Sequence, residues 1–202
     1  MKEVNKLQYS AGAVSKGFWF QEFKKYNELL NQGLTDKEIK IKQEKENILM
    51  APSEDYGKKM VNEVSKRTRA LPVKIGNMFS NLSVGDQKIL NTLGLMMTDR
   101  LFFEYMYEVY REKLLIGNLE FDNSDSRIFL KNKSEQSEKV SNFTLQTKKR
   151  LVGAYRTYLK EANLLIEEKG RSIIRKAILD INLEEEMKSK DLYPYLRVFM
   201  GE

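Results

Sequence analysis

Residues 101–110 read LFFEYMYEVY, and this stretch indicates the class of fold. Eight of its ten residues are apolar or aromatic, so at helical spacing they cover most faces of a helix. A helix of that kind must be packed on several sides. We therefore predict one long central helix from Asp86 to Ile116, ended by the Gly117-Asn118 pair, inside a mainly α-helical bundle.

The composition of the chain supports a helical protein and excludes several classes of enzyme. Its 202 residues include only three prolines, no cysteine and no histidine. Without cysteine and histidine the chain cannot build disulfides, zinc fingers, cysteine proteases or Ser-His-Asp triads. We expect a protein without catalytic activity, metal or other cofactor.

The residues before the central helix predict three short helices. Apolar residues at helical spacing predict a first helix over 16–32. A second helix over 35–49 begins with a capping box of Thr35 and Glu38. Ala51-Pro52 ends it, a third helix runs from Ser53 to Leu71, and a loop with Gly76 and Asn77 follows. Short helices with a break before a basic one are typical of a helix-turn-helix unit.

The residues after the central helix have the outline of a winged helix. A polar link over 118–126 precedes helices over 127–140 and 145–164. Two short strands, 164–166 and 172–179, then surround a turn at Gly170 and form a short C-terminal β-hairpin. We expect two units, a helix-turn-helix-like domain over 1–117 and a winged-helix-like subdomain over 118–202.

Positive charge is concentrated in two blocks of the chain. The net charge is +6, but residues 56–76 and 131–176 alone hold six and twelve Lys/Arg against one and five acids. The rest of the chain is therefore net negative, and the blocks are candidate phosphate contacts. In the first block the candidates are Lys58, Lys59, Lys66, Arg67 and Arg69; in the second they are Lys148, Lys149, Arg150, Arg156, Lys169, Arg171 and Arg175.

Acidic residues on the central helix allow a second interpretation. Glu104 and Glu108 are spaced to share one helix face, as a paired-carboxylate or metal site would require. Arg100 and Arg111 have the spacing of ion-pair partners for the same two glutamates. We favour ion pairs on a largely buried helix, because no second carboxylate-rich motif completes a metal site.

Nothing in the sequence indicates a membrane protein. The N-terminus lacks the apolar run of a signal peptide, and the longest apolar stretch, over 89–97, is interrupted by Asn91 and Thr92. We expect a cytoplasmic protein.

Four segments together resemble a known family. They are residues 9–12 (YSAG), 98–113 (TDRLFFEYMYEVYREK), 133–140 (KSEQSEKV) and 159–165 (LKEANLL), with Tyr155 between the last two. They resemble the BrxA family, the small component of BREX bacteriophage-defence systems, which has been likened to the RNA-binding factor NusB. The chain departs from the family pattern at Phe143, where we expect tryptophan, and at Asn163, where glycine is usual.

The resemblance implies a helical protein of winged-helix character that binds double-stranded DNA beside other BREX components. It implies no catalytic residues. Two alternatives stay open: an RNA-binding protein of the NusB kind, and an assembly scaffold whose basic blocks meet an acidic partner subunit.

Overall fold

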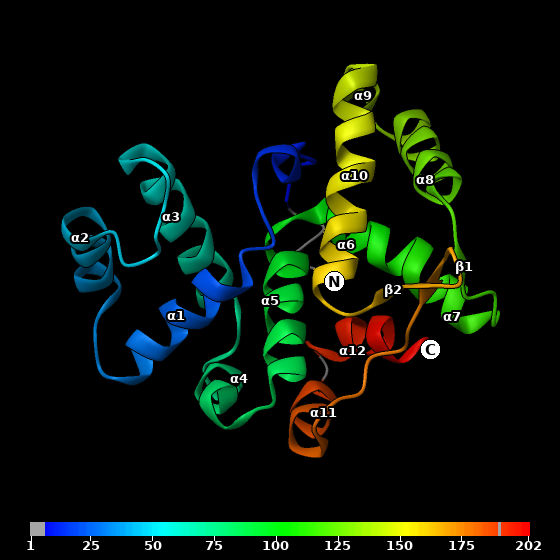
Figure 1. The fold of residues 1–202 in the computed structure, drawn as a ribbon. Helices are drawn as coiled ribbons and strands as arrows, with labels where there is room; N and C mark the ends of the chain where they lie inside the picture. Colours follow the sequence, from blue (N-terminus) through cyan, green and yellow to red (C-terminus); the bar gives the residue numbers. More distant parts are fainter. Residues whose placement is uncertain (1–6, 190) are drawn as a thin grey trace.

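The computed structural model describes residues 7–189 and 191–202. Helix α5 (Val84–Thr98) stands between two groups of elements. Helices α1 to α4 lie on one side of it, and the later helices with a small sheet lie on the other (Figure 1). The prediction of a mainly helical protein with a C-terminal hairpin is confirmed.

Side-chain caps fix the starts of the second and third helices. Thr35 and Glu38 form the expected capping box, and the Ser53 hydroxyl accepts from the amide of Tyr56. The expected loop around Gly76 is helical, because Pro72 has the fixed φ suited to a helix start. The elements are η2 (Gly12–Ser15), α1 (Phe20–Asn31), α2 (Asp36–Glu46), α3 (Glu54–Ala70), α4 (Val73–Met78) and η3 (Phe79–Asn81).

The prediction of one unbroken central helix over 86–116 is wrong. Asp99 is extended, and its carboxylate accepts from the amide of Phe102, so it caps a new helix. A short acceptor side chain at an N-cap competes with helix continuation, so Asp99 is a local signal for the break. The second part consists of α6 (Arg100–Tyr105), a π-helical turn η4 (Met106–Tyr110) and α7 (Arg111–Leu115).

A three-stranded antiparallel sheet closes the other side, in the order β1-β3-β2. Its first strand, β1 (Glu120–Phe121), lies in the segment expected to be only a polar link, and Phe121 is buried. The other elements are α8 (Asn123–Gln136), α9 (Glu138–Ser141), α10 (Leu145–Glu161), β2 (Leu165–Glu168), β3 (Arg171–Ile174), α11 (Ile181–Met187) and α12 (Tyr193–Met200).

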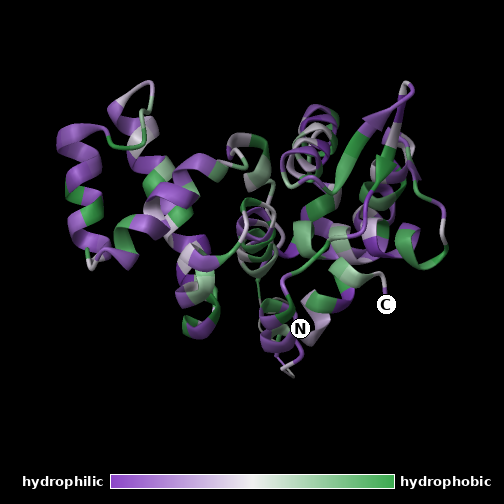
Figure 2. Cartoon of the chain, turned by 60° about the horizontal axis from the view of Figure 1, so that its bottom comes forward, coloured by the Kyte–Doolittle hydropathy of each residue, from purple (hydrophilic) through white to green (hydrophobic). Residues whose placement is uncertain are grey.

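The buried apolar residues form one cluster that spans both halves of the chain. The buried apolar residues of α5 contribute to this cluster between the two groups of elements. Hydrophobic residues, drawn green, recur in the interior of both groups (Figure 2). Segment η2 packs on α10, and α4 packs on α11, so contacts cross residue 117 repeatedly. The division into 1–117 and 118–202 stays a prediction. Along residues 7–189 and 191–202, no helix combines the length and apolar character needed to cross a membrane.

Helices α3 and α5 approach closely at Gly94. A Cβ at residue 94 would lie 2.9 Å from the Cβ of Arg67 and 3.0 Å from its backbone oxygen. The Arg67 side chain fills the space beside this contact and is 1% exposed. Its guanidinium donates to the carbonyls of Gly17 and Phe18 and to Asn91, so it ties the N-terminal segment to both helices.

We predict that Gly94→Ala destabilises the protein by about 1–3 kcal/mol, because backbone of α3 blocks the added methyl group. Urea unfolding would measure the change. Gly85→Ala is the matched control on the same helix, since its Cβ would meet only the Ser83 hydroxyl at 3.5 Å. Equal unfolding midpoints for the two variants would contradict the close contact.

Candidate nucleic-acid interface

Arg67 is not a surface cation, and the expectation that it contacts a phosphate is corrected. It lies on the face of α3 that packs on α5, and the bonds described above occupy the two terminal nitrogens of its guanidinium. Burial lowers its pKa from the ordinary arginine value. Arginine is rarely fully buried, so the sequence gives no reason to expect Arg67 inside the protein while Lys66 and Arg69 stay on the surface.

The remaining candidates of the first block are spread along α3. Lys58 forms an ion pair with Glu54 at 2.6 Å, and Lys66 reaches the carbonyl of Thr98 at 3.5 Å. Lys59 and Arg69 have no ion-pair partner among the described residues. The first block therefore offers three cations, Lys59, Lys66 and Arg69, that form no ion pair among the described residues.

The second block places its cations on one face of α10. Lys149, Arg150 and Lys160 are exposed, and Arg156 is half-buried. Lys149, Arg156 and Lys160 are seven and four residues apart, which aligns them along one side of the helix, and Arg150 lies beside Lys149. Arg150 donates to the carbonyl of Val14 and Lys148 to that of Ser141, so both point along the surface.

Glu167 on β2 neutralises part of this face. Lys160 and Arg156 lie 2.7 Å and 3.0 Å from its carboxylate, and the Ser172 hydroxyl donates to it. These hydrogen bonds lower the pKa of Glu167 to about 2, so it is charged at neutral pH. Arg156 also donates to Asn123 and Ser172, which holds its guanidinium beside the sheet.

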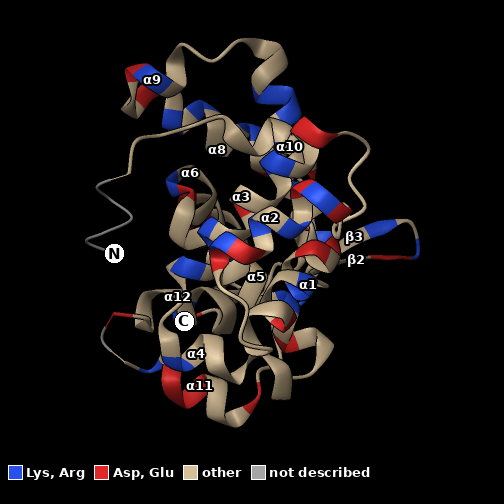
Figure 3. Cartoon of the chain, turned by 90° about the vertical axis from the view of Figure 1, so that its left-hand side faces the viewer, with Lys and Arg blue, Asp and Glu red and all other residues tan. Residues whose placement is uncertain are grey.

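The β2–β3 hairpin is less basic than the sequence analysis expected. It projects from the body with basic residues on β3 and acidic residues on β2 (Figure 3). Arg171 pairs with Glu120, while Lys169 and Arg175 are exposed without ion-pair partners among the described residues. Glu167 and Glu168 offset the charges of Lys169 and Arg171, so the cationic surface is centred on α10.

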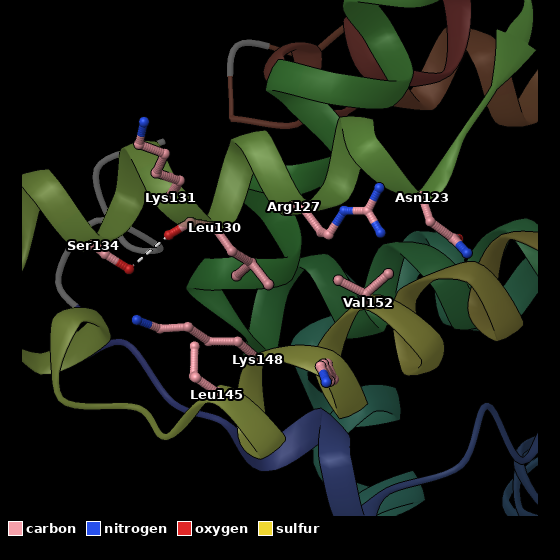
Figure 4. A pocket seen from close by; sticks show the side chains of 9 residues that line it. Asn123, Arg127, Leu130, Lys131, Ser134, Leu145, Lys148 and Val152 are labelled. Carbon is pink, nitrogen blue, oxygen red and sulfur yellow. Dashed lines mark hydrogen bonds between the residues drawn. The ribbon is translucent and has the colours of Figure 1, made fainter.

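A groove of about 590 Å³ separates α8 from α10 (Figure 4). Its rims carry four cations, and the described lining includes no carboxylate. Leu130 and Val152 form an apolar floor, and Leu145 is 80% exposed. The cations are Arg127 and Lys131 on α8 and Lys148 and Lys149 on α10.

Two of these cations, Arg127 and Lys131, are absent from the candidates proposed from the sequence. Their spacing of four residues on one predicted helix is a signal that could have identified them. What the sequence could not supply is the packing of α8 against α10, which brings both beside Lys148 and Lys149.

The carboxylates of the central helix are held by ion pairs. Lys133 on α8 pairs with both Glu104 and Glu108, and Glu104 also accepts from Arg100 and Tyr9. Burial acts to raise the pKa of Glu104, but hydrogen bonds from Lys133, Arg100 and Tyr9 outweigh it, so the pKa lies below the ordinary value. Among the described residues, no group of acidic side chains could hold a metal ion.

We predict that Lys133→Met destabilises the protein by about 2–4 kcal/mol, because Glu104 is left buried with fewer partners. Thermal melts at several pH values would measure this. Since the pKa of Glu104 is lowered on folding, its contribution is present at neutral pH and is lost as the pH falls below about 4. Lys131→Met, an exposed neighbour on the same helix, is the control; equal melting of both variants would contradict the network.

Comparisons with known proteins identify the family. Residues 7–191 match the family model described as BrxA. The chain is 32% identical over 199 residues to the BREX protein BrxA of Bacillus cereus (strain H3081.97), covering 98% of this chain and 100% of the relative. A crystal structure of an uncharacterized protein from Magnetospirillum magneticum has a similar fold, with a TM-score of 0.76 at 12% identity over 97% of this chain and 100% of that one. The chain belongs to the BrxA family.

Proposed function

We propose that this protein binds double-stranded DNA through α10 and its surroundings, as a component of a BREX bacteriophage-defence system. The observation that carries the proposal is the alignment of exposed cations along α10, continued by the cationic rims of the α8–α10 groove. Clustered Lys and Arg on one surface are the usual footprint of phosphate binding.

The order of the elements supports a winged-helix interpretation of this surface. A helix (α7), a strand (β1), two longer helices (α8 and α10) separated by the single turn of α9, and a hairpin (β2–β3) follow one another, and β3 pairs between β1 and β2. In this interpretation α10 takes the place of the recognition helix and the hairpin that of the wing. Lys169 at the turn and Arg175 after β3 supply the cations of the wing.

The family supports a role beside other BREX components, since the Bacillus cereus relative is named as a BREX protein. We extend that role to this chain, and we propose that it acts in the cytoplasm and without catalysis. The lack of histidine and cysteine supports the last point, because most general bases and nucleophilic thiols are then unavailable.

One observation favours a second candidate, an assembly scaffold. The groove combines its cations with the apolar side chains of Leu130, Leu145 and Val152. Aliphatic side chains add little to phosphate binding, whereas a protein segment with carboxylates around an apolar anchor would use both kinds of contact. RNA is the third candidate, since its phosphates would meet the same cations.

We predict that Lys149→Glu combined with Arg150→Glu abolishes duplex binding without unfolding the protein. Fluorescence anisotropy of a labelled random-sequence duplex, measured across a salt series, is the test. For the unchanged protein, log affinity should fall linearly with log salt, because binding releases counterions from the phosphates. Circular dichroism melts would verify folding.

The matched comparison is Lys59→Glu combined with Arg69→Glu on α3, which changes the net charge equally. This variant should keep most of the affinity. Loss of binding in the α3 variant alone would move the interface to the first block. Failure of the unchanged protein to bind duplex at low salt would refute the DNA proposal, and competition with structured RNA would then test the RNA candidate.

We also predict that Glu167→Gln raises duplex affinity by about two- to fivefold at low salt, because it removes one negative charge and releases Arg156 and Lys160. Glu168→Gln is the control, since it removes the same charge from the neighbouring position without an ion pair in the described structure. A smaller gain for Glu168→Gln is expected. Equal gains would show that release of the two cations contributes nothing.

A further inference from the structure

The glycine at the middle of α10 has no evident structural reason. Gly153 is the ninth of seventeen residues of the helix and is exposed. Glycine is the least favourable residue after proline in a helix interior, so an exposed interior glycine lowers stability without compensation. Its backbone is not left-handed, and an added Cβ would meet nothing within 4 Å.

Two other glycines inside long helices do have a reason. A Cβ at Gly57 would lie 2.3 Å from the side-chain nitrogen of Gln43, and a Cβ at Gly94 would meet the backbone of α3. Both allow close packing within the chain. At Gly153 the helix backbone is equally open to a close contact, but it faces the outside of the molecule, so the contact would be with another molecule.

The residues around Gly153 indicate what approaches it. Lys149 and Arg150 lie one turn before it, and Arg156 and Thr157 one turn after it, on the same face. Three cations and a hydroxyl surround a patch of bare helix backbone. Of the three cations, Arg156 is already bound to Glu167, Asn123 and Ser172, so Lys149 and Arg150, which form no ion pair among the described residues, are the two that can meet a ligand.

We propose that Gly153 is a phosphate seat, where one phosphodiester of the DNA backbone rests directly against α10. Lys149 and Arg150, one turn before the seat, hold this phosphate, and the missing side chain lets it approach within reach of both. The helix then crosses the DNA backbone near its own midpoint. This inference rests on the proposed function and adds to it a contact residue that charge alone does not reveal.

The test uses substitutions that improve the helix while filling the seat. Gly153→Ala should raise the melting temperature by about 2–4 °C, since alanine favours the helix. It should nevertheless weaken duplex binding, and Gly153→Leu should weaken it by about tenfold or more and reduce the salt slope by about 1, the value of one lost phosphate contact.

Gly76→Ala is the matched control, because its Cβ on α4 would also meet nothing within 4 Å. It should leave duplex affinity unchanged. Unchanged affinity in Gly153→Leu, with binding still lost in the Lys149/Arg150 reversal, would overturn the seat and keep the proposed function. Weaker binding with an unchanged salt slope would show that Gly153 contacts a part of the DNA other than a phosphate, and would overturn the proposed phosphate seat. Absence of duplex binding by the unchanged protein would overturn both proposals.

Discussion

The buried guanidinium of Arg67 is the interaction on which the arrangement of the first half depends. It donates to two consecutive carbonyls of the N-terminal segment, at Gly17 and Phe18, and to Asn91 on α5. A charge removed from water in this way must be satisfied by fixed dipoles, so the two elements that supply the dipoles are held in one geometry with α3, which supplies the charge. Gly94 allows the close contact of α3 with α5, and the ring of Trp19 lies beside the guanidinium at 5.6 Å. The same burial removes Arg67 from any surface role, which weakens the first basic block.

A second buried cation performs a similar task on the other side of α5. Lys133 joins α8 to the central aromatic helix through Glu104 and Glu108, and Tyr9 connects the N-terminal segment to the same carboxylate. These contacts give α8 a fixed position against α6 and η4. Since α8 also packs on α10, the ion pairs that stabilise the core position both rims of the groove. The acidic residues that could suggest an active site are thus structural supports of the cationic surface.

The proposed interface combines surfaces of different character. The exposed face of α10 is cationic and open at Gly153, as a phosphate contact requires. The groove beside it is cationic at its rims and apolar at its floor. A protein partner seated in the groove would cover Lys148 and Lys149, two of the cations proposed to contact DNA. Partner binding and DNA binding would then compete for the same side chains.

The sequence by itself determined the helical class, the capping box at Thr35, the C-terminal hairpin and the family, because periodicity, caps and motifs are local properties of the chain. It also located the cationic helix over 145–164. The break at Asp99 is likewise local, since its carboxylate caps the next helix, although the prediction missed it. Only the tertiary structure decided that Arg67 faces inward and that Arg127 and Lys131 lie opposite Lys148 and Lys149. It also paired Glu167 with the cations of α10. The physical reason is that burial, ion pairing and the facing of two helices depend on residues far apart in the chain, and spacing along one helix does not record them.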